Sequence, residues 1–588
     1  MQRNEVNRQE TWDLSHLYPN KESVKKDLDQ VQSLIQKAKE VSVQGEENLL
    51  HYTKIYEEIQ VRLNHLMNFE ELYVSTDYTD LDRAKFADQV RQRLDDFQEQ
   101  LQEVEAVFFS LEEDVLKKYG QDPCYGAFFQ RIQREKAHYL GRDKEEMLKA
   151  LAPVLDLPVQ IYEAAKFKDL TFPNFQLGQK LYPLSFSLYE DSYAYHPDKD
   201  LRRGAYVNFS NQLAKYEESM GQAFLAMVKR DLALSKLRGY PSVFDYMLRT
   251  HQISRKIYDD HLDTIMEKLA PIIRDYAQIL KARYNLDEMT YADLKLSPNP
   301  QVEKTYSMEE AKDLILKALA PYGEDYVNYV SRAFPERWID YADNEGKSTG
   351  GFCASPYQVH SYILMTYRGL LSDVFTLVHE LGHAGHFHRA SDHQSILCLE
   401  PSLYFVESPS TTNELVLKEY LLKKAKTPEE RQVILGESIA NTYYHNFVTH
   451  FLEAYFQREV YRAIEEGEAL QAKDLSRIFL ETLEKFFGKD IVIPESAGLT
   501  WMRQPHYYEE SGFYSYTYSA GLSLGTLLGS RLTEDPETCQ KWLEVLAMGG
   551  SQSPQDLAGH VGIDITSTKP LEKTISIIKS MVDEMKGA

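Results

Sequence analysis

The residues best suited to chemistry lie in one short segment, Leu371–Arg389, which reads LSDVFTLVHELGHAGHFHR. Within it, His379, Glu380 and His383 form an HExxH pattern. An α-helix turns once in about 3.6 residues, so histidines four apart lie on one face and both imidazoles can reach one Zn²⁺. The glutamate beside the first histidine can take a proton from a water molecule at that metal. A chance match in a core helix is the competing interpretation, and a third ligand decides between the two.

Two familiar spacings for that third ligand are excluded by counting along the chain. The pattern HExxHxxGxxH requires glycine and histidine at positions that His386 and Arg389 occupy here. A spacing of the thermolysin kind requires a glutamate where the chain has Ser402 and Leu403. The remaining acidic candidates after the motif are Asp392, Glu400, Glu407 and Glu414.

Glu407 and Glu414 are the strongest of these candidates. They lie seven residues apart in FVESPSTTNELVLKEYLL, which on a helix is two turns along one face. Glu407 could therefore bind the metal while Glu414 holds a ligand histidine through a hydrogen bond.

Hydrolysis of a carbonyl compound also needs a donor for the oxyanion that forms on attack. The candidate segment is PHYYEESGFYSYTYSAG, residues 505–521, with His506 upstream and Tyr514, Tyr516 and Tyr518 in alternation. The alternative is that alternating tyrosines only pack a half-buried surface, and the sequence leaves both open.

The elements that must position these residues are mostly helical. In residues 20–42 the apolar side chains are spaced by three and four, which predicts a helix with one buried stripe: Val24, Leu28, Val31, Ile35 and Ala38. Residues 168–199 contain prolines and short alternating runs, which indicate loops and short strands and suggest a domain boundary there. Residues 355–367 are β-prone. We expect an N-terminal helical domain in residues 1–200 and a catalytic domain in residues 201–588.

Composition limits the function classes. The 588 residues include 90 Asp and Glu against 66 Lys and Arg, a net charge of −24, which disfavours nucleic acid as a partner. The four cysteines form no CxxC pair, which favours a reducing compartment. No apolar run is long enough to span a membrane, and we expect a soluble cytoplasmic protein. The charge also raises the hypothesis that the walls of the substrate-binding channel, if there is one, are acidic and favour basic or neutral substrates.

With Glu407 placed 24 residues after His383, the site resembles that of the thimet oligopeptidase and oligoendopeptidase F family of zinc metallopeptidases, and oligoendopeptidase F most closely. The likeness extends over most of the chain. Further segments that resemble the family are Thr11-Trp12-Asp13-Leu14 with Leu17-Tyr18, Arg337-Trp338-Ile339-Asp340, Asn344-Glu345-Gly346-Lys347 with Gly350, and His506 with the tyrosines.

The resemblance implies a mainly α fold of two lobes that flank a deep channel, with a small β-sheet beside the zinc helix and the N-terminal domain covering the channel. It implies that His379, His383 and Glu407 bind one Zn²⁺ per chain and that Glu380 is the general base of an endopeptidase acting on oligopeptides.

The resemblance also implies roles around the substrate. His506 and one tyrosine are expected to stabilise the tetrahedral intermediate, with Tyr516 the first choice and Tyr514 the second. Substrate contacts are expected from Tyr518 and from an edge strand at residues 350–362, where Gly350 and Gly351 let a peptide backbone approach.

Two other functions are weighed against this one. A zinc carboxypeptidase or dipeptidase would need a cation such as Arg503 to capture a free terminus. A non-catalytic scaffold with a structural zinc would normally complete the site with Cys or His, and only Cys398 lies near the motif. The sequence leaves the oligomeric state open.

Overall fold

The apolar stripe predicted for residues 20–42 forms the first long helix, α1 (Lys21–Glu40), in the computed structural model. Asn20 caps this helix, its side chain accepting a hydrogen bond from the Ser23 N–H at 2.9 Å. All five residues of the predicted stripe are buried: Val24, Leu28, Val31, Ile35 and Ala38. Burying each of the larger of these side chains stabilises the fold by about 1.5–3 kcal/mol.

The structure describes residues 2–43, 46–299, 304–348, 350–508 and 512–587. In its first part, helices pack around a core of their own, which runs from Tyr18 to Ile132 and includes Leu397 and Cys398 from far along the chain. From Tyr162 onward most of the buried apolar residues join a second, larger core. The first helices are α1, α2 (Glu46–Ser75), α3 (Leu81–Ser110), α4 (Glu113–Tyr119), α5 (Gly126–Lys136), α6 (Arg142–Leu155) and α7 (Leu157–Glu163). The division of the chain at residue 200 stays a prediction.

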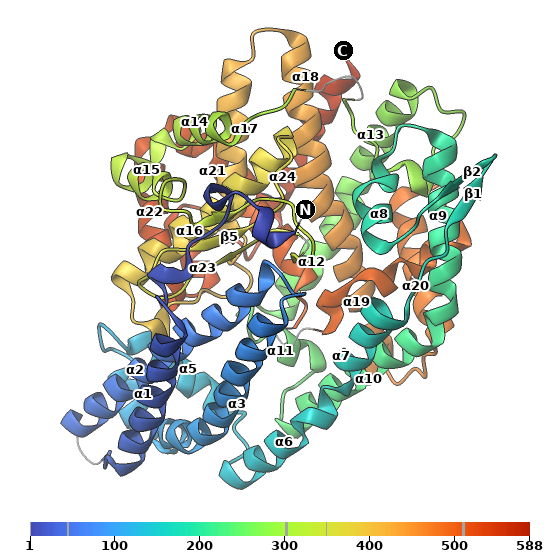
Figure 1. Cartoon of the computed structure of the whole chain (residues 1–588). Coiled ribbons are helices and arrows are strands. Elements are labelled where there is room, and N and C mark those ends of the chain that lie inside the picture. Colours follow the sequence, from blue (N-terminus) through green and yellow to red (C-terminus); the bar gives the residue numbers. More distant parts are fainter. Residues whose placement is uncertain (1, 44–45, 300–303, 349, 509–511, 588) are drawn as a thin grey trace.

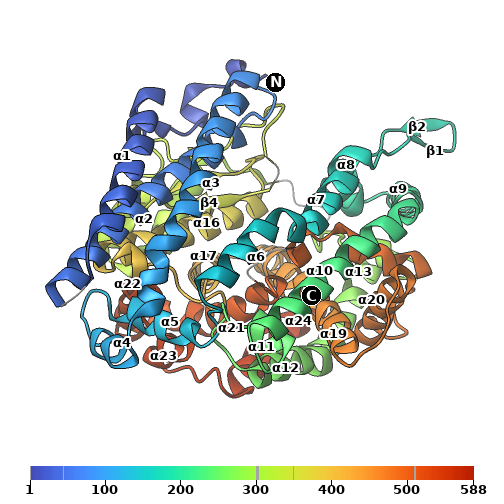
Figure 2. The same ribbon diagram turned by 90° about the horizontal axis from the view of Figure 1, so that it is seen from below.

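Figures 1 and 2 show two sides of the molecule, with α1–α5 beside α16 on one side and α7–α10, α19 and α20 on the other. The helices of the larger core are α8 (Phe186–Asp191), α9 (Lys199–Leu213), α10 (Glu217–Leu237), α11 (Val243–Met247), α12 (Arg255–Thr264), α13 (Ala270–Arg283), α14 (Met308–Ala318), α15 (Glu324–Ser331), α16 (Leu371–His393), α17 (Ser408–Lys424), α18 (Pro428–Glu437), α19 (His450–Glu465), α20 (Ala472–Phe487), α21 (Ser515–Glu534), α22 (Pro536–Met548), α23 (Pro554–His560) and α24 (Lys569–Lys586). Two π-helical segments, Ser438–Tyr443 and His445–Thr449, connect α18 to α19.

Short strands form in the regions where the sequence and the resemblance predict them, and one further strand, at residues 339–340, lies outside those regions. A hairpin of β1 (Phe175–Leu177) and β2 (Lys180–Tyr182) lies in the loop-rich region. A second sheet has the order β3-β5-β4, from β3 (Ile339–Asp340), β5 (Tyr362–Leu364) and β4 (Phe352–Ala354). Strand β3 runs parallel to β5, β4 runs antiparallel to it, and β4 is therefore an edge strand.

The N-terminal segment holds this sheet in place. Trp12 packs with Tyr362 and Leu364 of β5 in a small buried cluster. The Asp13 N–H donates to the carbonyl of Arg337 at 2.9 Å, just before β3. The sheet contacts the N-terminal part of α16, so the segment at the start of the chain supports the region that carries the histidine motif.

The mainly α fold with a small sheet beside the motif helix is confirmed. Within the described residues, no helix combines the length and the apolar character that crossing a membrane requires.

Candidate active site

The two histidines of the motif lie side by side on α16. Asp373 in the first turn accepts hydrogen bonds from the N–H groups of Arg368 and Leu370 at 2.7 and 3.0 Å, which fixes the start of the helix. Two turns on, the rings of His379 and His383 are 5.1 Å apart between centroids. Both Nε2 atoms point to the same place, because each lies close to one carboxylate oxygen of Glu407.

Glu407 completes a group of three side chains that could hold a metal ion. Its Oε2 is 3.3 Å from Nε2 of His379 and 3.4 Å from Nε2 of His383. Ligands about 2.0–2.1 Å from Zn²⁺ in a tetrahedron lie about 3.3–3.4 Å from each other. The three side chains therefore fit one zinc ion and leave its fourth position to the cavity. Glu407 comes directly before α17, where the Ser410 hydroxyl also donates to its Oε2 at 2.9 Å.

Glu414, the second glutamate of the predicted pair, contacts His379 and is not one of the three grouped side chains. Its Oε1 lies 2.7 Å from Nδ1 of His379, and its other oxygen accepts a hydrogen bond from the Thr442 hydroxyl. The carboxylate favours the proton on Nδ1, so the lone pair of Nε2 faces the metal position.

Glycines bring these helices close enough to meet. A Cβ on Gly382, inside the motif, would lie 2.6 Å from Cα of Ser410 on α17. A Cβ on Gly521 of α21 would lie 2.7 Å from the carbonyl carbon of Glu407. Real Cβ contacts are longer, so both positions exclude any side chain. Helices α16, α17 and α21 thus place Glu407 next to the histidines through backbone contact.

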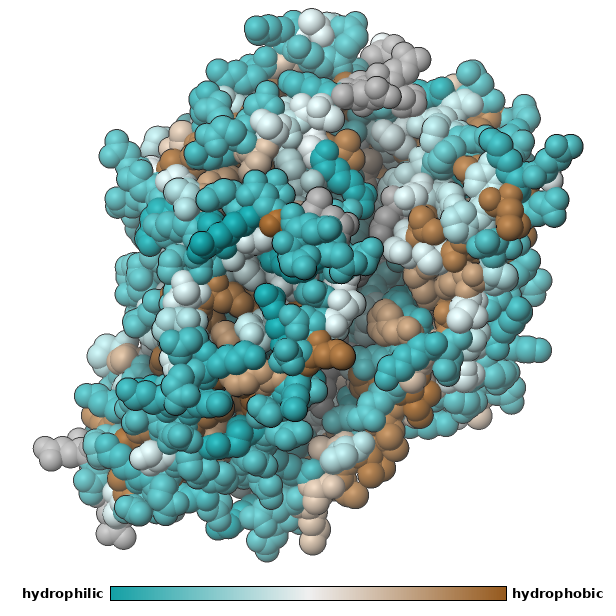
Figure 3. Space-filling view, in the orientation of Figure 1, coloured by the Kyte–Doolittle hydropathy of each residue, from teal (hydrophilic) through white to brown (hydrophobic). Residues whose placement is uncertain are grey.

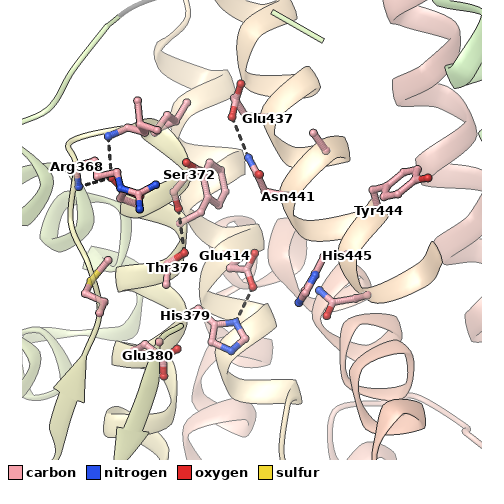
Figure 4. A pocket seen from close by; sticks show the side chains of 18 of the residues that line it. Arg368, Ser372, Thr376, His379, Glu380, Glu414, Glu437, Asn441, Tyr444 and His445 are labelled. Carbon is pink, nitrogen blue, oxygen red and sulfur yellow. Dashed lines mark hydrogen bonds and ion pairs between the residues drawn. The ribbon is translucent and has the colours of Figure 1, made fainter. Parts of the chain in front are cut away.

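Glu380 lies beside His379 on the side of α16 that faces the sheet, as Figure 4 shows. Its side chain is buried, and this burial raises the pKa of its carboxyl group above the usual value. A Cβ on Gly351, which precedes the edge strand β4, would lie 3.5 Å from Oε1 of Glu380. The carboxylate therefore lies between the metal ligands and the start of that strand.

These groups face one cavity of about 1500 Å³, which is larger than most small-molecule pockets. Its opening is visible as the furrow between the two sides of the molecule (Figure 3). The lining includes Gly350, Gly351, Tyr514 and Tyr518 along with the metal-site residues. Gly350 has φ of +83°, a conformation that favours glycine.

The hypothesis of acidic channel walls is not supported by the lining. Outside the glutamates of the metal site, the described lining residues carry more positive than negative side chains: Lys295, Lys304, Lys347, Arg368, Lys424 and Lys426 against Asp343, Asp373, Glu430 and Glu437. With Glu380, Glu407 and Glu414 included, the described lining has seven acidic and six basic side chains and is therefore close to neutral. Arg503 is not available to a peptide terminus either, because it is held by Glu190 at 2.7 Å and lies outside the described lining.

The prediction for Tyr516 is wrong. Residues 515–534 form a helix, so Tyr514 and Tyr518, four apart, share a face, while Tyr516 points the other way. The Tyr516 side chain is fully buried among His251, Tyr258, His261 and Tyr404, and its hydroxyl has no hydrogen-bond partner in the described part of the chain.

His506 lies beside the two tyrosines that face the cavity. Its ring centroid is 5.0 Å from that of Tyr514 and 5.7 Å from that of Tyr518. Burial lowers the pKa of His506 to about 4, so the imidazole is neutral near pH 7 and carries one N–H donor.

The sequence interpretation missed a polar cluster next to His506. It contains His445, His450 and Glu453, of which His445 lines the cavity (Figure 4). The histidines stand five apart in YYHNFVTHFLE, a spacing that ordinary helix periodicity does not bring together.

Comparison with known proteins agrees with this geometry. The model of peptidase family M3 matches residues 192–577. Oligopeptidase PepF of Bacillus subtilis (strain 168) is 28% identical, with 99% of this chain and 88% of that protein covered. An oligoendopeptidase F homolog of Borreliella burgdorferi is 26% identical, with 99% of each covered.

Two solved structures share the fold. A peptidase structure from Chlamydophila abortus superposes with a TM-score of 0.84 at 24% identity, covering 100% of this chain and 99% of that one. Oligoendopeptidase F from Enterococcus faecium gives 0.74 at 20% identity, covering 96% and 97%. The resemblance seen in the motifs is confirmed, and the chain belongs to peptidase family M3.

Proposed function

We propose that this protein is a zinc-dependent endopeptidase that hydrolyses oligopeptides, with one Zn²⁺ per chain. The observation that carries the proposal is the convergence of His379, His383 and Glu407 within 3.3–3.4 Å, at the wall of a cavity that Glu380 also lines. Zn²⁺ bound by these residues would act as a Lewis acid toward water and the scissile carbonyl. Membership of the family and relatives named as oligopeptidases support the same activity.

Glu380 is the proposed general base. It follows a metal ligand directly in the chain and lines the cavity, and its raised pKa suits a group that must accept a proton and later release it. It takes a proton from the attacking water and delivers it to the nitrogen of the leaving amine.

The edge strand β4 is proposed to hold the substrate. One of its sides pairs with β5, and Gly350, Gly351, Phe352 and Cys353 line the cavity. An extended peptide that adds to this edge would form backbone hydrogen bonds and place its carbonyl near the metal ligands. A site of this kind recognises backbone rather than a free terminus, which favours an endopeptidase.

The oxyanion donor is proposed to be Tyr514, supported by His506. Tyr514 lines the cavity, whereas His506 contacts the Tyr514 ring but is not among the described lining residues, so the tyrosine hydroxyl is the more direct donor to a substrate. Tyr518 is proposed as a substrate contact. A cytoplasmic location is also proposed, supported by the four cysteines, none of which forms a disulfide.

Replacing Glu380 tests the mechanism. Glu380→Gln should bind zinc as tightly as the wild type and lose nearly all turnover of peptides blocked at both ends. Glu400→Gln, an exposed position outside the site, is the matched control and should retain activity. Near wild-type cleavage by Glu380→Gln would refute the proposed base, and failure of the wild type to cut blocked peptides would refute endopeptidase activity.

A further inference from the structure

A second group of metal-type donors lies beside the first, near the same cavity. His450, Glu453 and His506 each place one ligand atom within 4.8 Å of the other two. His450 and Glu453 lie in the first turn of α19, and His506 lies in the 3₁₀ turn Pro505–Tyr508. The two histidines and one carboxylate are the donor types that Zn²⁺ binds.

Glu453 is a buried carboxylate that attracts cations. Its Oε2 accepts a hydrogen bond from Nδ1 of His450 at 2.7 Å, with further donors in Gln504 and Ser515. Burial alone would raise the pKa of Glu453, but the neighbouring histidines and the Gln504 hydrogen bond hold it below the usual value. The carboxylate is therefore ionised near pH 7, as a metal ligand has to be.

His445 adds a fourth donor, a third histidine. The π-helical segment His445–Thr449 follows an i→i+5 pattern, which brings residues five apart to successive turns of one side. Nε2 of His445 consequently lies 3.1 Å from Nε2 of His450. Burial and the neighbouring His450 keep the pKa of His445 well below its usual value, so this imidazole is neutral. His445 lines the cavity, which gives an ion a path to the cluster.

We propose that His450, Glu453 and His506, with His445 beside them, form a second, weaker Zn²⁺ site whose occupation inhibits the enzyme. It is weaker because Oε2 of Glu453 already accepts hydrogen bonds from His450, Gln504 and Ser515, which a metal ion would have to displace. In the first site, Oε2 of Glu407 already lies 3.3–3.4 Å from the Nε2 atoms of both histidines. Binding would take up a ring nitrogen of His506, which could then no longer support Tyr514 in catalysis.

The inhibitory effect rests on the role proposed for His506, but occupation of the site does not. Metal uptake therefore tests the site independently of activity. Full-length protein is equilibrated with rising concentrations of zinc alone, and bound metal is measured by elemental analysis after dialysis. Wild-type protein should take up a second zinc ion. His383→Ala, which damages the first site, should retain the weaker ion.

His450→Gln and Glu453→Gln should each weaken the second uptake by more than about tenfold, since loss of even a residue that supports a ligand costs that much. His560→Gln, an exposed histidine on α23, is the matched control and should retain both ions. Circular dichroism checks that both variants fold. Uptake of only one ion by the wild type, or full uptake by folded His450→Gln and Glu453→Gln, overturns the site.

The activity arm then tests inhibition. In wild-type protein, peptide cleavage should fall as the second ion binds, and in His450→Gln the inhibiting zinc concentration should rise by the same factor. Equal inhibition of both proteins overturns the inhibitory role. A protein with two zinc ions and no peptidase activity would instead contradict the proposed function and leave the second site standing.

Discussion

Glu414 holds His379 through a hydrogen bond of 2.7 Å between Oε1 and Nδ1, while Thr442 donates to the other oxygen of the same carboxylate. The carboxylate and the histidine come from different helices, α17 and α16, so the bond also ties the helix that carries both histidines of the motif to the helix that begins directly after Glu407. The imidazole orientation is thereby set before any metal arrives.

Removing the charge of Glu414 should weaken metal binding. We expect Glu414→Gln to raise the zinc dissociation constant by about 10–100-fold, because the histidine becomes a less basic ligand. Competition with a chromophoric chelator measures this constant. Thr442→Val, which leaves the carboxylate in place, should have a smaller effect, and equal losses in the two variants would contradict the argument.

Substitution of Tyr514 and substitution of Tyr516 should have different effects on activity and stability. Tyr514→Phe removes a hydroxyl that faces the cavity and should lower kcat by about 10²-fold with little change in KM. Tyr516→Phe removes a buried hydroxyl without a partner, so activity should persist and stability should stay equal or rise by about 1 kcal/mol. Steady-state kinetics and thermal unfolding measure both. A greater kcat loss in Tyr516→Phe would reverse the assignment.

Gly521 packs so closely against Glu407 that a methyl group at position 521 should destabilise the fold. Gly521→Ala would press a methyl group against Glu407 and should cost about 1–3 kcal/mol of stability, with reduced zinc content. Gly559→Ala on α23 is the matched control, since its Cβ would meet nothing within 4 Å and alanine favours helix. Unfolding in denaturant and metal analysis compare them, and a neutral Gly521→Ala would disprove the close-contact argument.

Stability should depend on pH through Asp293. This buried carboxylate binds Arg202 and Arg203; burial alone would raise its pKa, but these hydrogen bonds lower it in the folded state. The carboxylate thus stabilises the fold fully above its unfolded pKa of about 3.9, and less as pH falls through the lower folded value. Asp293→Asn should lose about 3–5 kcal/mol at pH 7, because Arg202 becomes a buried unpaired charge.

Denaturant unfolding at several pH values measures the difference between wild type and Asp293→Asn. The difference should be constant from pH 7 to about pH 5 and shrink below about pH 4. A difference that grows on acidification would contradict the lowered pKa.

The close approach of His379 and His383 was predictable because it depends on short-range spacing. His379 and His383 share a helix face at any tertiary arrangement, and the stripe on α1 follows the same periodicity. Glu407 could be proposed as the third residue only by excluding other spacings and from the family resemblance. No periodic pattern spans the 24 residues that separate it from His383.

The failures have physical reasons too. Three tyrosines in alternation would share one face of a strand, but on a helix only the first and third do, so the helix separated Tyr516 from Tyr514 and Tyr518. The approach of His445 to His450 depends on a π-helical turn, which hydrophobic periodicity does not reveal. The charge of the cavity wall depends on which few side chains face it, so the net charge of the chain did not predict it.

The glycine contacts between α17 and α21 also determine when, during synthesis of the chain, the candidate metal site can form. During synthesis the chain presents His379, His383 and Glu407 more than a hundred residues before the glycine face of α21 emerges. A nascent chain thus carries all three ligands but lacks the surface against which Glu407 packs. Under the proposed function, peptide cleavage would then begin only after the C-terminal helices have been synthesised. The growing chain and other nascent chains would thus not be exposed to an incompletely folded peptidase.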